Sequence, residues 1–215
     1  MGERRWLYFA VGILAVTCFA AGAWAGDGVV ALQTAEPSCA DNSGNIYVDC
    51  NNGTVTDNRT GLVWLAKANC FGGQLWPEAM EIVSGLADLN VAFCVGKGLT
   101  GEQCDCGLSD GSSPGEWRLP TVEEWETMVS NALGGAGNPD CTGTPPTITD
   151  DTGDFCYLAG SSFGDVMVGD YWSSSTEALV PSGAWVVSLS TGQTTAVNKR
   201  EDLAPFYVWP VRGGQ

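Results

Sequence analysis

The sequence predicts an α+β domain that is held together by disulfide bonds. Two amphipathic helical segments lie between one group of short strands near the N-terminus and another near the C-terminus. Eight cysteines follow an export signal, and the connecting segments are long and rich in glycine. A chain of 215 residues is long enough for one domain with its own core.

The N-terminus predicts a secretory signal peptide over residues 1–25. Arg4 and Arg5 precede an apolar run at 7–21, which is short for a membrane span, and residues 23–25 give a small-x-small cleavage pattern. A twin-arginine signal and a lipid-modified Cys18 are weaker alternatives, because neither has its full consensus.

We therefore expect a secreted mature chain, in the periplasm, at the cell surface or released, without membrane insertion after the signal is removed. A flexible leader is expected over 26–45, followed by the folded domain over 46–215.

The even number of mature cysteines in an exported chain predicts disulfides, although the spacing does not fix their pairing. Cys39 with Cys50, and Cys141 with Cys156, are close enough to close local loops. A metal or redox site at the Cys-Asp-Cys motif is the alternative, but zinc sites usually have other spacings, so we expect two separate disulfides there. The predicted disulfide cysteines are Cys39, Cys50, Cys70, Cys94, Cys104, Cys106, Cys141 and Cys156.

The charge of the chain restricts its partners. Its 25 acidic and 9 basic residues give a net charge of -16, which disfavours nucleic acid, anionic lipid and sulfated polysaccharide. No histidine is present, so the commonest general base and metal ligand is missing. Without that base, the serines at 173–175 are poor nucleophiles. We expect no catalytic residues, no enzymatic activity and no nucleic-acid partner.

The first structural elements should form a small antiparallel meander. Short β-rich runs at Tyr47–Val48, Thr54–Thr56 and Leu62–Trp64 alternate with turn residues such as Asn51-Asn52-Gly53. A helix should follow from about Pro77, with an apolar face that extends as far as Leu86 and Leu89. The cysteine- and glycine-rich segment 91–115 is expected to be a loop ordered by disulfides.

The segment GEWRLPTVEEWETMV predicts a second helix and a structural clamp in front of it. Thr121 and Glu124 form a capping box, and the residues that follow give one apolar face. Trp117 should be buried, Arg118 should bind carbonyls or a carboxylate, and Pro120 should fix the start of the helix.

The remainder of the chain should contain a long loop and then strands. The loop covers 133–170, and strands are expected in YWSSST, GAWVVSLSTGQTT and FYVWPVRGG. Trp185, Val187 and Leu189 alternate with smaller or polar residues, which predicts one solvent-facing side. We assign structural roles also to Trp64, Trp172 and Trp209, and expect Arg212 to tie the last strand to the meander.

Six segments in order give a family resemblance: NGTVTDNRTGLVWL, WPEAM, EWRLPTVEEWETMV, YWSSST, AWVVSLSTG and YVWPVRGG. Together they resemble the Lcl C-terminal domain family over about residues 52–214. The resemblance implies a bacterial extracytoplasmic domain with a C-type-lectin-like fold, in which two helices pack on small antiparallel sheets with long disulfide-stapled loops. It also implies carbohydrate binding and adhesion, although this chain lacks a Gly-X-Y stalk and the Glu-Pro-Asn and Trp-Asn-Asp sugar-binding motifs.

From these features we expect an exported, non-catalytic binding or adhesion module that recognises a glycan or protein ligand through its loops at 137–170 and 173–182. Trp185 and Tyr207 are candidates for an aromatic platform under a sugar ring. The full set of candidate ligand-binding residues is Asp165, Asp170, Ser174, Ser175, Trp185 and Tyr207.

The motif ITDDTGD suggests calcium as the candidate ion for this loop. Asp150, Asp151 and Asp154 offer hard oxygen ligands around a turn at Gly153. A solvated acidic loop is the alternative interpretation. Apart from calcium, we expect no cofactor.

Two other functions remain open. The first alternative is a structural subunit of an extracellular or cell-surface assembly, with self-assembly through its loops or leader. An oxidase of the formylglycine-generating kind is the second alternative, and free thiols after export would favour it.

Overall fold

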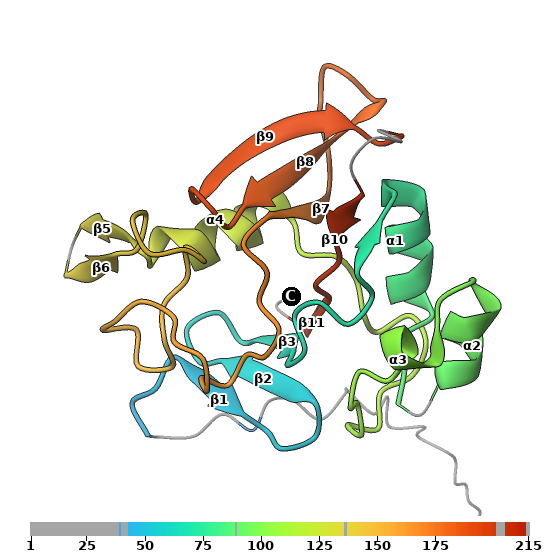
Figure 1. Cartoon of the computed structure of the whole chain (residues 1–215), viewed down its shortest axis with the longest axis horizontal. Coiled ribbons are helices and arrows are strands. Elements are labelled where there is room, and N and C mark those ends of the chain that lie inside the picture. The colour runs from blue at the N-terminus through green and yellow to red at the C-terminus, as the bar shows by residue number, and fades with distance from the viewer. Residues whose placement is uncertain (1–38, 40–42, 89, 136, 201–204, 214–215) are drawn as a thin grey trace, which may run out of the picture. The chain divides into compact units, whose positions relative to one another are not determined.

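The computed structural model describes Cys39 and residues 43–88, 90–135, 137–200 and 205–213. The predicted signal peptide, Cys18, Leu89 and most of the predicted leader lie outside the described residues. The described residues all belong to one compact unit, Pro37–Gln215. This part of the chain is mixed α/β, with four helices and three small sheets (Figure 1).

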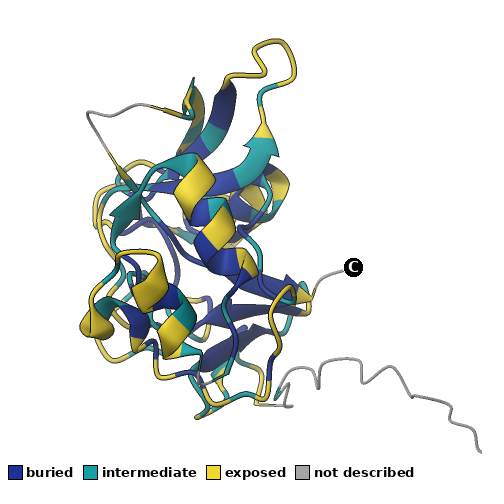
Figure 2. Ribbon diagram, turned by 90° about the vertical axis from the view of Figure 1, so that its right-hand side faces the viewer, coloured by how far each residue is buried: buried dark blue, intermediate teal, exposed yellow. Residues whose placement is uncertain are grey.

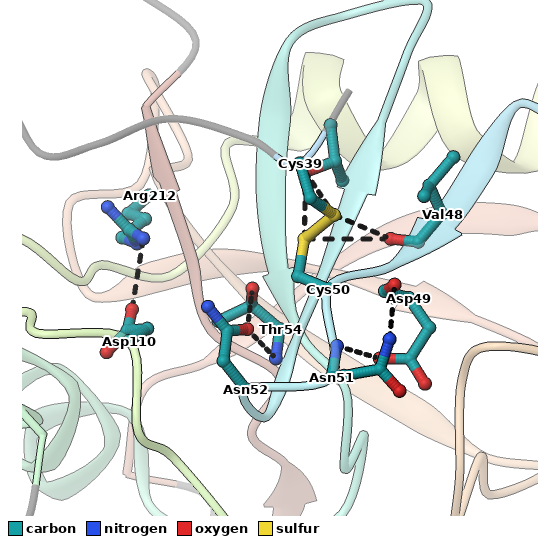
Figure 3. Close-up of a disulfide and its surroundings, with 10 residues drawn as sticks. Cys39, Val48, Asp49, Cys50, Asn51, Asn52, Thr54, Asp110 and Arg212 are labelled. Atoms are coloured by element: carbon teal, nitrogen blue, oxygen red, sulfur yellow. Dashed lines mark hydrogen bonds and ion pairs between the residues drawn. A yellow bond between two sulfur atoms is a disulfide. The ribbon is translucent and has the colours of Figure 1, made fainter. Parts of the chain in front are cut away.

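The first sheet contains the predicted meander and the end of the chain. Strands β1 (Tyr47–Asp49), β2 (Thr54–Asp57) and β3 (Leu62–Leu65) are antiparallel neighbours, and β11 (Val211–Gly213) pairs with β3. The turn between β1 and β2 is closed by its own side chains, since the Asn52 amide oxygen accepts hydrogen bonds from the Thr54 amide and hydroxyl (Figure 3).

The second sheet has the order β4-β10-β7-β8-β9. Its strands are β4 (Gly73–Gln74), β10 (Phe206–Tyr207), β7 (Asp170–Thr176), β8 (Gly183–Ser188) and β9 (Gln193–Asn198). Strand β10 is parallel to β7, and the other neighbours are antiparallel.

The prediction of one solvent-facing side for β8 is wrong. Val186 and Val187 point to opposite faces and are both buried, whereas Trp185 is only half-buried. Val187 lies opposite Tyr171 and Val186 lies opposite Trp172, and both of these β7 residues are fully buried. The sheet is therefore covered on both sides at this point.

The predicted loop 133–170 contains a third, two-stranded sheet. Strands β5 (Leu133–Gly135) and β6 (Asn138–Asp140) form a short antiparallel hairpin. Periodicity did not reveal it, because three of these six residues are glycine or proline and the strands have no apolar face.

The first helix, α1 (Trp76–Ser84), is shorter than predicted. It ends before Gly85, whose backbone approaches α2 so closely that a Cβ there would lie 2.0 Å from the Phe93 ring. Leu86 lies beyond the helix end, so the apolar periodicity continued past the helix itself.

Two short helices lie in the segment 91–115 that was predicted to be a loop. They are α2 (Val91–Gly96) and α3 (Gly101–Cys104), and α3 starts with a capping box formed by Thr100 and Gln103. The capping box was a readable signal, but both helices are too short to show a period.

Helix α4 (Val122–Ser130) starts as predicted. The Thr121 hydroxyl accepts a hydrogen bond from the Glu124 amide, and the Glu124 carboxylate accepts one from the Thr121 amide. Its predicted apolar face is buried, and Figure 2 shows helices with exposed residues on one side and buried residues toward the sheets.

Tryptophans dominate the core. The Trp125 ring centroid lies 5.1 Å from that of Trp64 and 5.8 Å from that of Trp209. The Trp209 indole donates to the Leu65 carbonyl and the Trp125 indole to the Trp172 carbonyl. Each such aromatic pair adds about 0.5–1.5 kcal/mol to the burial of its area, so this cluster joins both main sheets to α4.

The eight predicted cysteines form four disulfides within the described residues. The two local pairs are as anticipated, Cys39–Cys50 and Cys141–Cys156. The Cys-Asp-Cys motif contributes to two separate disulfides, Cys94–Cys104 and Cys70–Cys106, and the second joins the end of the meander to the segment behind α3.

None of the helices in the described ranges has the length and apolar character needed to cross a bilayer.

Candidate functional site

The segment in front of α4 is a clamp built around Arg118. Its guanidinium donates two hydrogen bonds to the Glu124 carboxylate, at 2.7 and 2.6 Å, and one to the Gly213 carbonyl at 3.1 Å. The Arg118 backbone also pairs with Val211 in both directions. The same residue therefore joins the first turn of α4 to the closing strand β11.

A buried ion pair lies beside this clamp. Arg212 and Asp110 are 3.0 Å apart, and their side chains are 6% and 0% exposed (Figure 3). Asp110 also accepts hydrogen bonds from the Ser112 amide and hydroxyl, and the Ser112 hydroxyl accepts one from the Trp117 indole. The meander contacts Arg212 through backbone pairing with Val63, whereas the Arg212 guanidinium binds the loop that contains Asp110, a different partner from the expected one.

The serines of β7 hold the start of α4. The Ser175 hydroxyl accepts a hydrogen bond from the Val122 amide at 3.0 Å, and the Ser174 hydroxyl donates to the Pro120 carbonyl at 3.2 Å. Ser173 is fully buried. Ser174 and Ser175, two of the candidate ligand-binding residues, thus form hydrogen bonds within the chain itself.

The two aromatic candidates do not form a common platform. Tyr207 lies opposite Tyr171, with ring centroids 5.3 Å apart, and packs over Gly169. Trp185 lies on β8 opposite Ala196, on the far side of β7 from Tyr207. Each ring is half-buried in its own surroundings.

The carboxylates of the 150–154 turn bind their own loop. One carboxylate oxygen of Asp150 accepts hydrogen bonds from the Gly153 amide, at 3.0 Å, and from the Thr152 hydroxyl. The Asp151 carboxylate accepts hydrogen bonds from the Ser162 amide and hydroxyl. Asp154 is exposed at the edge of the turn.

No group of three or more acidic, cysteine or histidine side chains in the described part of the chain is placed to hold a metal ion. Asp165 is exposed and has a positive φ of 55°, and the half-buried Asp170 lies at the first position of β7. The geometry gives the calcium prediction no support, and it stays a prediction.

The loop 141–170 is nevertheless held in place by a disulfide and by internal hydrogen bonds. The Cys141–Cys156 disulfide closes its first half, and the Phe155 carbonyl accepts a hydrogen bond from the Asp150 amide at 2.9 Å. The Tyr157 hydroxyl donates to the Phe163 carbonyl at 3.0 Å. Burial, followed by the charges of Asp165 and Asp151, raises the pKa of Tyr157. Its hydroxyl therefore keeps its proton and remains a donor at neutral pH.

A family model, the Lcl C-terminal domain, matches residues 53–212. The chain belongs to the Lcl C-terminal domain family. The match begins at the turn after β1 and ends within β11, so it includes β2 and β3 of the meander, the clamp and the larger sheet. None of the curated proteins matches the chain.

This Lcl C-terminal domain presents its exposed apolar side chains mainly on two loops. Of the nine large apolar side chains that the described residues expose, six lie in 137–182. They are Phe155, Leu158, Met167, Val168, Leu179 and Val180.

The sequence interpretation pointed to these loops but missed their apolar residues. Phe155 and Leu158 belong to the apolar run 155–159, which is bounded by Asp154 and Gly160 and is too short to show a period. A short apolar run in a polar loop is the available signal, but only the folded chain tells whether its residues are buried.

Proposed function

We propose that this Lcl C-terminal domain is an exported, non-catalytic binding or adhesion module with a C-type-lectin-like fold. Its ligand is a glycan or a protein outside the cell, and it binds to the loops at 137–170 and 173–182. The observation that carries the proposal is the group of six exposed apolar side chains on these loops. Exposed apolar side chains on ordered loops are typical of recognition surfaces.

The fold and the location have separate support. Strand β11 returns to the N-terminal meander and pairs with β3. Both α1 and α4 contact strand β7. Four disulfides in the described part favour an oxidising compartment and therefore export.

The non-catalytic part of the proposal rests on the cysteines and serines. An oxidase of the formylglycine-generating kind would use a reactive cysteine, whereas the eight cysteines of the domain are paired in disulfides. The hydroxyls of Ser174 and Ser175 are held by the clamp and α4.

An adhesion assay tests this function. Beads coated with the mature protein should adhere to bacterial cells, and beads coated with a variant that has serine at all six exposed apolar positions should not. Equal adhesion by both would contradict the proposal. Treating the cells with protease or with periodate then separates a protein ligand from a glycan.

Calcium is tested independently of the ligand. If the ion orders the 150–154 turn, calcium should raise the unfolding temperature of the mature protein relative to a chelator, because it binds the folded state preferentially. The rise should disappear in Asp150→Asn/Asp154→Asn. An unchanged unfolding temperature would exclude calcium from the function.

The second candidate function, a subunit of a surface assembly, is favoured by the edge of the larger sheet. Among the described residues β9 pairs only with β8, over six residues without a break. The strand contains no proline or charged residue, and such edges accept further strands. Sedimentation at rising concentration should then show self-association that Thr195→Lys abolishes and Thr191→Lys, in the preceding turn, does not.

A further inference from the structure

We infer that Phe155 and Leu158 form a binding site for a basic amphipathic segment of a partner protein. The inference rests on the proposed function and specifies its ligand. Three features carry it: the rigid presentation of the two side chains, the charge around them, and the chemistry that such a surface can recognise.

The two side chains are presented by a fixed backbone. Phe155 and Leu158 are 66% and 65% exposed, whereas Cys156 and Tyr157 between them are half-buried. Cys156 is held by its disulfide, and the backbone amide of Tyr157 donates to the Ile148 carbonyl at 3.0 Å. Because the backbone is already ordered, little conformational entropy is lost when a partner covers the two side chains.

The two side chains lie in a long stretch of sequence whose charged residues are all acidic. Between Arg118 and Lys199 there is no lysine or arginine. The acidic residues of that stretch are Glu123, Glu124, Glu126, Asp140, Asp150, Asp151, Asp154, Asp165, Asp170 and Glu177. Asp154 is the immediate neighbour of Phe155 and is exposed.

Two cations, one from the turn before β3 and one from the segment after it, lie next to this loop. A Cβ on Gly153 would lie 3.2 Å from the Arg59 guanidinium, and Lys67 forms a backbone bridge with Gly164. The Lys67 amine donates to the Asp105 carbonyl. With Asp150, Asp151, Asp154 and Asp165 in the same loop, the local charge remains negative.

An aromatic and an aliphatic side chain flanked by carboxylates match a segment with one apolar and one basic face. Such a segment covers Phe155 and Leu158 with its apolar face and directs lysine or arginine toward the carboxylates. A sugar ring would match the aromatic face of Phe155 but would leave Leu158 without a comparable contact. An anionic membrane would be repelled by the same carboxylates.

Synthetic peptides provide the test with the mature protein. One peptide has lysine and leucine at amphipathic helical spacing, a second replaces lysine with glutamate, and a third replaces leucine with serine. We expect the lysine–leucine peptide to bind most tightly by titration calorimetry, and added salt to weaken its binding.

Two variants separate the proposed site from general attraction to an acidic protein. Phe155→Ser/Leu158→Ser should lower the affinity for the lysine–leucine peptide by about tenfold or more, because it removes two side chains that become buried on binding. Leu179→Ser/Val180→Ser changes two other exposed apolar residues, 90% and 50% exposed, on another loop and should leave the affinity within about twofold. Circular dichroism should show that both variants remain folded.

Several outcomes would overturn the inference. These are equal affinity for the lysine–leucine and lysine–serine peptides, equal weakening by both variants, or Phe155-dependent binding to phosphatidylcholine vesicles. If cell adhesion depends on Phe155 and Leu158 but is abolished by periodate and not by protease, the ligand is a glycan, and the inference fails while the proposed function stands. If no loop variant alters adhesion, the proposed function itself fails.

Discussion

At the scale of single residues, Gly53 shows how one position joins two loops. It has a φ of +83°, and a Cβ there would lie 2.3 Å from the carbonyl oxygen of Gly107. Two residues after Gly107, the Ser109 amide donates a hydrogen bond to the Asn52 carbonyl. The turn between β1 and β2 is therefore pressed against the segment behind α3.

Gly61 offers a matched control for Gly53. Its φ is +73°, but a Cβ there would meet nothing within 4 Å. We expect Gly61→Ala to lower the free energy of unfolding by about 1 kcal/mol, the cost of the left-handed conformation. Gly53→Ala should lower it by about 3 kcal/mol or more, because backbone atoms must also move. Urea denaturation measures both, and equal losses would contradict the close contact.

The buried pair Arg212–Asp110 gives a second prediction at this scale. Arg212→Met leaves the Asp110 carboxylate buried without its cation, and should lower the free energy of unfolding by about 3–5 kcal/mol. Lys97→Met breaks an ion pair with Glu81 whose side chains are 31% and 58% exposed, and should cost at most about 1 kcal/mol. If both variants lowered the free energy of unfolding in urea by similar amounts, the buried Asp110 carboxylate would not need Arg212 as its cation.

At the scale of elements, the start of α4 was predictable in part. The capping box of Thr121 and Glu124 lies within four residues and was visible in the sequence. The Ser175 hydroxyl also caps the helix, because it accepts a hydrogen bond from the Val122 amide. Ser175 lies 53 positions after Val122 in the sequence. No local pattern connects those two residues, so only the pairing of β7 beside α4 reveals the contact.

This arrangement predicts additive effects at two different amides. Thr121→Ala and Ser175→Ala should each lower the free energy of unfolding by about 1 kcal/mol, and the double variant by about 2 kcal/mol. Ser130→Ala, at the other end of α4, is the control, since its exposed hydroxyl only donates to the Thr127 carbonyl. Hydrogen exchange at Val122 and Glu124 should accelerate in the corresponding variants, and unchanged exchange would contradict these roles.

At the scale of the whole molecule, buried tyrosines make the fold sensitive to high pH. Burial raises the pKa of Tyr47 and of Tyr171 well above the usual tyrosine value. The stability that these groups contribute is complete below about pH 10, where folded and unfolded chains are both protonated. Above it, the unfolded chain loses protons that the folded chain keeps, so stability falls as the pH rises.

Each of these tyrosines should lower the free energy of unfolding by up to about 1.4 kcal/mol per pH unit above about pH 10. Tyr47→Phe removes one ionisable group from the core and should make the decline less steep. The free energy of unfolding in urea, measured between neutral and alkaline pH, provides the test. An identical decline in wild type and Tyr47→Phe would assign the alkaline sensitivity to other groups.

The sequence by itself determined the features that depend on neighbours along the chain or on composition. Among these are the meander and its turns, the capping box of α4, the presence of disulfides, and the ordered motifs that identify the Lcl C-terminal domain family. Each of them depends on composition or on residues that are close together in the sequence, so the sequence alone carries the signal.

The tertiary structure decided what depends on contacts between distant segments. It paired Cys70 with Cys106, ended α1 where Gly85 meets Phe93, and directed Arg212 to Asp110. It also decided that Phe155 and Leu158 are exposed, although both are large apolar residues. Burial is a property of the packed molecule, because a side chain is buried only when other segments cover it.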